Sequence, residues 1–230
     1  MITGAGGGLG RAFVREVLAQ DWTVVAACHS SPADFPVEPS AVLRFDVSSR
    51  LGVRAATKTI VEKFGRIDLL INNAGITADG SSWQITDEAW AKVFDVNLKG
   101  AFLCSQAVLP SMLAQRDGQI INISSFAARR GHRGQASYVA AKAGLIGLTE
   151  SLAWEAGPQN VRVNAILPGI LPTPMTAQLT GDQLKELAGE NALGRINELE
   201  EVARFAAFLA TLKNVSGQIF QLDSRIARWT

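Results

Sequence analysis

The sequence predicts an α/β protein, a single doubly wound domain over residues 1–230 with a mostly parallel seven-stranded sheet. Short apolar runs alternate along the chain with longer segments of helical spacing, which is typical of parallel sheets covered by helices. Each run is continuously apolar rather than alternating with polar residues, as expected for strands buried on both faces. A chain of 230 residues is long enough to bury one large core.

The elements can be placed in chain order, although the first strand is truncated. Only Met1 and Ile2 precede a glycine-rich turn, so either this strand is short or a start lies upstream. The other six strands are predicted at residues 23–28, 41–45, 67–72, 119–123, 161–167 and 217–222. Helices are predicted at residues 11–20, 51–64, 86–98, 101–113, 137–156 and 199–212. Residues 29–40 are predicted to form a loop, and residues from about 169 to 195 a loop or lid.

The overall composition argues against several classes of function. With 47% hydrophobic residues and a net charge of +1, the chain has neither the charge of a nucleic-acid-binding protein nor the composition of a disordered one. The two cysteines, Cys28 and Cys104, indicate a reducing compartment without disulfides. No apolar run approaches the roughly 18 residues of a membrane span. We therefore expect a cytoplasmic protein with no nucleic-acid or membrane partner and no metal site.

A glycine-rich turn after the first strand is a candidate phosphate site. Gly4, Gly8 and Gly10 form the pattern T-G-x-x-x-G-x-G and lead into a helix. Small residues let the backbone approach a pyrophosphate, and the N-terminus of the helix offers free N–H groups. Such a turn can also serve only to join a strand to a helix.

Polar residues also follow the fourth strand and interrupt a helix. Asn72-Asn73-Ala74-Gly75 would lie at the carboxyl edge of the sheet, where ligands of such sheets bind, although the same residues can form a simple turn. Asn97 is a poor helix former beside Lys99-Gly100, where two helices are predicted to meet.

One further group of residues can carry acid–base chemistry. Ser125 follows the fifth strand, and Tyr138 and Lys142 lie on one face of the next helix, roughly 5–6 Å apart at Cβ. A nearby ammonium favours the phenolate, so we expect Lys142 to lower the pKa of Tyr138 toward neutrality. A Tyr and a Lys at this spacing are more often an ordinary surface pair.

Taken together, these motifs resemble those of the classical short-chain dehydrogenases/reductases along nearly the whole chain. The shared pattern has an order and spacing of its own: Thr3-Gly4-x3-Gly8-x-Gly10, Asp46, Asn72-Asn73-Ala74-Gly75, Asn97, Ser125, Tyr138-x3-Lys142 and Pro168-Gly169. Residues 134–147 and Leu193-Gly194-Arg195 look most like the β-ketoacyl-acyl-carrier-protein reductases. The resemblance implies a Rossmann-type fold.

The resemblance also implies roles for the catalytic residues. Tyr138 would be the acid–base residue and Ser125 would hold the carbonyl oxygen. Lys142 would bind the ribose hydroxyls of a dinucleotide and lower the pKa of Tyr138, and Asn97 would hold a water for proton relay.

A cofactor set follows in the same way. The nucleotide would lie over the glycine turn, with Asp46 near the adenine and Thr173 at the nicotinamide carboxamide. The complete predicted set is Thr3, Gly4, Gly8, Leu9, Gly10, His29, Asp46, Val47, Asn73, Ala74, Gly75, Tyr138, Lys142, Pro168, Gly169 and Thr173.

The residues that usually distinguish NAD-dependent from NADP-dependent enzymes give no clear answer here. Cys28 stands where an NAD enzyme usually has an acidic residue, and Gly7 where an NADP enzyme often has an arginine. His29, Ser30 and Ser31 could donate hydrogen bonds to a 2′-phosphate. NADP(H) is favoured and NAD(H) remains open.

The predicted function is an oxidoreductase that interconverts a ketone, such as a 3-oxoacyl thioester, and a secondary alcohol by hydride transfer. The alternative is a non-enzymatic dinucleotide-binding regulatory protein of the same fold. Residues 101–113 and 137–156 are predicted to form the interfaces of a homotetramer, because apolar residues surround most of the second helix.

Two segments depart from the pattern or remain open. The basic residues Arg129, Arg130, His132 and Arg133 are either a docking patch for an acyl carrier or a solvated loop face. Leu222-Asp223-Ser224-Arg225 stands where the family usually has Asp-Gly-Gly.

Overall fold

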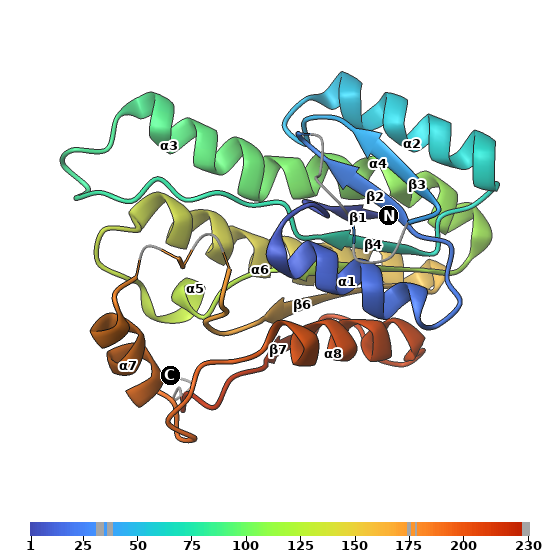
Figure 1. Cartoon of the computed structure of the whole chain (residues 1–230). Helices are drawn as coiled ribbons and strands as arrows, with labels where there is room; N and C mark the ends of the chain where they lie inside the picture. The colour runs from blue at the N-terminus through green and yellow to red at the C-terminus, as the bar shows by residue number, and fades with distance from the viewer. Residues whose placement is uncertain (31–34, 36–38, 174–175, 178, 227–230) are drawn as a thin grey trace.

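The structure, a computed structural model, describes residues 1–30, 35, 39–173, 176–177 and 179–226. Ser31 lies outside these residues. Seven strands form one sheet in the order β3-β2-β1-β4-β5-β6-β7, and every pairing within it is parallel (Figure 1). The doubly wound α/β prediction is therefore confirmed, with a sheet that is wholly rather than mostly parallel. The strands are β1 (Ile2–Thr3), β2 (Val25–Cys28), β3 (Ala41–Arg44), β4 (Leu69–Asn72), β5 (Gly118–Ile123), β6 (Val161–Leu167) and β7 (Ile219–Gln221).

The short strand β1 lies at the centre of the sheet. Ile2 pairs with Ala26 of β2 on one side and with Ile71 of β4 on the other. The amino group of Met1 donates to the carbonyl oxygen of Leu69 at 2.8 Å, which extends the contact with β4 by one residue. Two paired residues are thus enough to place the turn that follows β1 between β2 and β4.

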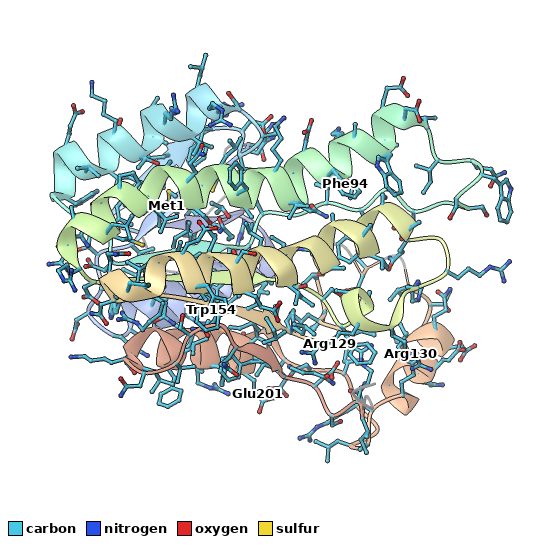
Figure 2. The ribbon with its side chains drawn as sticks, turned by 180° about the vertical axis from the view of Figure 1, so that it is seen from behind. Met1, Phe94, Arg129, Arg130, Trp154 and Glu201 are labelled. Carbon is cyan, nitrogen blue, oxygen red and sulfur yellow. The ribbon has the colours of Figure 1, made fainter. Side chains whose placement is uncertain are left out.

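The helices cover both faces of the sheet. Helices α1 (Gly8–Leu18) and α8 (Leu199–Thr211) pack on one face, as Figure 1 shows. Figure 2, seen from behind, shows α2 (Arg50–Phe64), α4 (Gly100–Gln115) and α6 (Ala136–Ala156) on the other face. The remaining helices are α3 (Asp87–Phe94), α5 (Ala127–Arg130) and α7 (Gly181–Gly189).

Successive residues of the central strands enter opposite cores. Ile71 and Ile121 pack with Phe13 of α1, whereas their neighbours Leu70 and Ile120 pack on the other face with residues of α2, α4 and α6. All four isoleucine and leucine side chains are fully buried, each contributing roughly 1.5–3 kcal/mol of transfer free energy. This two-sided burial explains why the strands are continuously apolar in sequence.

The helix break that the sequence predicts near Lys99-Gly100 is wrong. Helix α3 continues through a π-helical turn, Asp95–Lys99, directly into α4. Gly100 reflects close packing instead of a chain break, since a Cβ there would lie 2.8 Å from Cγ2 of Val47.

Two helices were absent from the prediction. Helix α7 lies within the segment predicted as a loop or lid, and Thr180 and Gln183 form a capping box at its start. The pattern T-x-x-Q was a usable signal. Helix α5 is a single turn of four residues, too short to produce a helical period.

Candidate active site

The serine and tyrosine of the predicted acid–base group meet at the carboxyl edge of the sheet. Strand β5 ends at Ile123 and delivers Ser125 to this edge, while Tyr138 lies in the first turn of α6. The two hydroxyl groups are hydrogen-bonded to each other. The Ser125 oxygen also accepts a hydrogen bond from the backbone N–H of Ala127 at 3.2 Å. A carbonyl oxygen placed between two such hydroxyls would face two hydrogen-bond donors.

Lys142 ties α6 to the end of β5. Its Nζ donates to the carbonyl oxygen of Ile123 at 2.7 Å, and its own carbonyl oxygen accepts from the Ser124 hydroxyl, also at 2.7 Å. The ammonium lies over the Tyr138 ring, 5.6 Å from the centroid. Only 4% of the residue is exposed, and this burial lowers the pKa of Lys142 to about 8.

The expected lowering of the Tyr138 pKa is wrong. Burial raises the pKa of Tyr138 above its ordinary value, and this effect outweighs the hydrogen bond with Ser125, which lowers it. The carboxylate of Asp79 raises it further. Lys142 directs its Nζ at Ile123 and over the face of the ring. Tyr138 therefore stays protonated at neutral pH, as a proton donor must.

Asn97 lies near Lys142, with Gly75 beside both side chains. It belongs to the π-helical turn, is 1% exposed, and forms two hydrogen bonds with the backbone of Ile76, at 2.8 and 2.9 Å. A Cβ on Gly75 would lie 3.4 Å from both the Asn97 amide oxygen and the Lys142 Nζ. The four predicted catalytic residues are thus brought together, and π-helical turns are frequent at functional sites.

The glycine turn after β1 is fixed by the residues that follow β4. The Thr3 hydroxyl accepts from the backbone N–H groups of Asn73 and Ala74 at 3.0 and 3.1 Å. The Asn73 side chain donates to the carbonyl oxygens of Thr3 and Gly4, each at 3.1 Å. Gly4 has a φ of +61°, and a Cβ there would lie 2.8 Å from the Cα of Ala74. The sequence signals at residues 3–4 and 73–75 are therefore two halves of one structure.

The same turn offers a cradle that suits a pyrophosphate. A Cβ at Gly10 would overlap the carbonyl oxygen of Gly4 and lie 2.7 Å from the Cα of Ala5, so the helix packs tightly under the turn. Helix α1 begins at Gly8 with an extended Gly7, no side-chain cap and no acidic residue in its first turn. Its first N–H groups and positive dipole end are thus suited to an anion, and the buried Leu9 anchors the turn.

Strand β2 ends at Cys28, and His29, which follows it, lies near Asp46 after β3. Burial raises the pKa of the Cys28 thiol, which therefore stays neutral. His29 is exposed, its carbonyl oxygen accepts from Nε of Arg44 at 3.3 Å, and its Nε2 lies 4.0 Å from an oxygen of Asp46. Burial would raise the pKa of Asp46, but two hydrogen bonds from Ser48 and nearby positive charges hold it below its ordinary value. Val47, next in the chain, packs against Gly100 of α4.

The segment after β6 begins at Pro168. Gly169 has a φ of +80°, and a Cβ there would lie 2.7 Å from the Cβ of Asp223. Thr173 is held locally, its N–H donating to the Thr176 hydroxyl at 2.9 Å. The structure thus ties Gly169 to the segment after β7, whereas the hydrogen bonds of Thr173 with Thr176 lie within its own segment.

Two features beneath and beside the site were not predicted. Asn72, buried in β4, donates to Asn122 of β5 at 2.9 Å and to Ser105 of α4 at 3.1 Å, and Asn122 donates to Thr149 of α6 at 2.9 Å. This network joins four elements below Lys142; its only signal was asparagine within apolar strands. Asp79, in the segment between β4 and α3, accepts from the Gln135 side chain at 3.1 Å, which ties this segment to the start of α6.

Among the described residues, no three His, Cys, Asp or Glu side chains are grouped so that they could hold a metal ion. Nor does any helix among them have the length and apolar character needed to cross a membrane.

Comparison with known proteins assigns the family. The profile of the family described as short chain dehydrogenase matches residues 1–184. The chain is similar to the 3-oxoacyl-[acyl-carrier-protein] reductase FabG of Thermotoga maritima, 38% identical over 97% of this chain and 95% of that one. It is also similar to the 3-oxoacyl-[acyl-carrier-protein] reductase of a Synechocystis strain, 39% identical over 97% of this chain and 94% of that one.

A solved structure agrees with these sequence relatives. That of levodione reductase superposes with a TM-score of 0.91 at 32% identity, covering 97% of this chain and 95% of that chain. These relatives do not favour the non-enzymatic alternative. The chain therefore belongs to the short-chain dehydrogenase family and is an NAD(P)-dependent oxidoreductase that interconverts ketones and secondary alcohols.

Proposed function

We propose that this chain reduces the keto group of a 3-oxoacyl thioester to a hydroxyl group, with NADPH as the preferred cofactor. The observation that carries the proposal is the meeting of Ser125, Tyr138, Lys142 and Asn97 beside the glycine turn. The named relatives, matched over 97% of the chain, support the choice of substrate class.

In the proposed reaction the substrate carbonyl oxygen lies between the hydroxyls of Ser125 and Tyr138. Ser125 donates a hydrogen bond to this oxygen, and Tyr138 transfers its proton to it as negative charge develops. The bound nicotinamide supplies the hydride to the carbonyl carbon, so that carbon and oxygen each gain one hydrogen. Burial keeps the Tyr138 phenol protonated, which suits the direction of reduction.

Lys142 and Asn97 are proposed to support this proton transfer. Lys142 uses one N–H on Ile123, which leaves two donors for the ribose hydroxyls of the nucleotide. Asn97 is fixed on both sides of its amide by Ile76 and is proposed to position a water that returns a proton to Tyr138.

The cofactor is proposed to lie along the carboxyl edge from the glycine turn to Tyr138. Gly4, Gly8 and Gly10 cradle the pyrophosphate, and Asn73 to Gly75 line the ribose. Asp46 and Val47 lie toward the adenine, and the segment from Pro168 to Thr173 lies toward the carboxamide. A neutral Cys28 and the exposed Arg44 favour a 2′-phosphate, although Asp46 beside His29 partly offsets them.

The protein is proposed to act as a cytoplasmic homotetramer built on α4 and α6. Trp154 of α6, labelled in Figure 2, is 85% exposed. Phe102 of α4 is 37% exposed, so both helices present aromatic surface to the outside. Association would bury this surface. The segment from 169 to 195 is proposed to close over the acyl chain, beside the basic residues 129–133.

Turnover with defined substrates tests the proposal. Oxidation of NADPH and of NADH should be followed with a 3-oxoacyl thioester, carried on coenzyme A or on an acyl carrier protein, and with a simple cyclic ketone. The highest kcat/KM is expected for the thioester with NADPH. A preference of more than about tenfold for the cyclic ketone, or for NADH, would contradict the substrate or the cofactor assignment, respectively. Ser125→Ala should abolish most turnover with every ketone.

A further inference from the structure

The segment after β7 brings an arginine to the substrate side of the active site. Leu222 donates its N–H to the carbonyl oxygen of Leu167 at 3.0 Å, and the chain then crosses the end of β6. Arg225, three residues later, has a side chain only 9% exposed. This arginine lies within the segment that departs from the usual Asp-Gly-Gly of the family.

A buried carboxylate fixes the Arg225 guanidinium. Nε of Arg225 donates to Oδ2 of Asp223 at 2.6 Å, and its Nη2 contacts the same oxygen. The Asp223 side chain is 3% exposed and lies against Gly169, where no Cβ could fit. Gln221 donates to both Asp223 and the Arg225 carbonyl oxygen, each at 2.7 Å. The guanidinium is thereby held in one orientation relative to β6 and β7.

The guanidinium of Arg225 lies over the ring of Phe126. The Arg225 Cζ is 3.9 Å from the centre of the Phe126 ring, and Phe126 is 5% exposed. Such a cation–π contact is favourable and is stronger when both groups are shielded from water. Phe126 directly follows Ser125, so Arg225 covers the residue that anchors the Ser125 turn.

The free edge of the guanidinium reaches a carboxylate at the end of α7, which also lies near an arginine of α5. Its Nη1 is 3.7 Å from a Glu190 oxygen at the end of α7, and Nη1 of Arg130 at the end of α5 is 3.9 Å from the same oxygen. Figure 2 shows Arg130 beside α7. The neighbouring Ser224 accepts hydrogen bonds from the N–H groups of Ala192 and Leu193, both at 3.1 Å. Arg225 is thus the point where α5, α7 and the ends of β6 and β7 meet.

We propose that Arg225 is a positioning residue for the reduction, acting through Phe126 to hold the Ser125 hydroxyl where it meets the carbonyl oxygen. The proposal rests on the proposed role of Ser125. Helix α5 is too short to fix the Ser125 turn by itself. A planar guanidinium can pair with Asp223 and stack on Phe126 at the same time, whereas an ammonium keeps the charge and loses the stacked plane.

The experiment compares Arg225→Lys with Phe126→Leu, Phe126→Tyr and the double variant Arg225→Lys/Phe126→Leu. Arg204→Lys, at an exposed arginine of α8, is the matched control. Arg225→Lys and Phe126→Leu should each lower kcat by between about 10- and 100-fold, because a displacement of an ångström is enough for such a loss. The cofactor Kd should not change. The double variant should be no worse than either single one, and Phe126→Tyr should keep the wild-type kcat.

Three results would overturn the proposal. The first is a folded Arg225→Lys protein with kcat within about twofold of wild type, the second additive losses in the double variant, and the third equal kcat values for Phe126→Leu and Phe126→Tyr. Thermal melting identifies any variant that fails to fold. If Arg225→Lys is such a variant, the comparison of kcat between Phe126→Leu and Phe126→Tyr tests the proposal. If wild type reduces no ketone, or Ser125→Ala stays active, the proposed function fails instead of this inference.

Discussion

The two sides of the carboxyl edge are built in different ways. The side proposed to hold the nucleotide, called the nucleotide side below, joins the turn after β1 to the residues after β4 by backbone groups and short side chains, with glycines where a Cβ would collide. The side proposed to hold the substrate, called the substrate side, joins α5, α7 and the end of the chain by long charged side chains around Arg225. Backbone contact fixes a cradle for a constant ligand, whereas side chains can be exchanged as the substrate changes.

The largest effect is expected from Tyr138→Phe, which should impair the reaction on the substrate side and leave nucleotide binding on the other side intact. The phenyl ring keeps the packing, but the proton donor is lost, so kcat should fall by about 10²–10⁴-fold. Nucleotide binding, measured by fluorescence titration, should persist. A variant that keeps more than about a tenth of the wild-type rate would show that Tyr138 is not the acid.

Gly10→Ala should damage the nucleotide side alone. The added methyl group would meet the Gly4 carbonyl oxygen, so the turn must move, at a cost of about 1–3 kcal/mol of stability and with weaker nucleotide binding. Gly147→Ala is the control, because nothing lies within 4 Å of its Cβ position in α6, and it should stabilise the protein by about 1 kcal/mol. Denaturant unfolding and nucleotide titration measure both effects; unimpaired nucleotide binding by the Gly10 variant would contradict the cradle.

Lys142→Met should reveal the cost of the buried ammonium at the boundary between the two sides. Burial lowers the pKa of Lys142 from its ordinary value of 10.5, which applies in the unfolded chain, to about 8 in the folded protein. The unfolded chain therefore binds more protons between about pH 8 and 10.5, so the wild-type free energy of unfolding rises with pH in this window. The Met variant lacks this rise, which amounts to about 3 kcal/mol. Parallel unfolding curves of the two proteins across pH 8–10.5 would refute the lowered pKa.

The smallest change is expected from Cys28→Asp, which alters only the outer end of the nucleotide side. A carboxylate there would repel a 2′-phosphate and accept hydrogen bonds from a ribose diol. The ratio of kcat/KM for NADPH to that for NADH should fall by about tenfold, or roughly 1.4 kcal/mol. Cys104→Ser, at a thiol buried in the core on the other face of the sheet from Cys28, should leave this ratio unchanged. An increased NADPH preference in the Asp variant would place the 2′-phosphate elsewhere.

The local structure of the proposed nucleotide side was more evident from the sequence than that of the proposed substrate side, for a physical reason. Glycines mark places where the backbone permits few residue types, and the spacing of Tyr138 and Lys142 places both on one face of a single helix. Each of these signals can be recognised within a short stretch of sequence. The short β1 and the parallel strands were likewise evident from continuous apolar runs.

The features that the sequence did not reveal depend on contacts between residues far apart in the chain. Nothing local indicates that Arg225 reaches Phe126, or that Asn72 pairs with Asn122, because long side chains can point in several directions. The direction of the Tyr138 pKa shift was mistaken for the same reason. The spacing places Lys142 on the same helix face as Tyr138, but the Lys142 ammonium donates to the Ile123 carbonyl oxygen, and burial of the phenol raises the pKa of Tyr138. The supposed helix break at Gly100 was a packing contact with Val47.

The bonds between the turn after β1 and the residues after β4 also bear on how the chain acquires its structure during synthesis. Thr3 accepts hydrogen bonds from residues 70 and 71 positions later, so its hydroxyl lacks these two partners until more than seventy residues have left the ribosome. Contacts between residues so far apart in sequence form slowly, because the entropy of closing a long loop is lost before the contacts can stabilise it. The first helix, α1, can form early, but the loop beside it matures only with β4. Nascent chains are therefore expected to gain the ability to hold a nucleotide late, after the first third of the protein has been made.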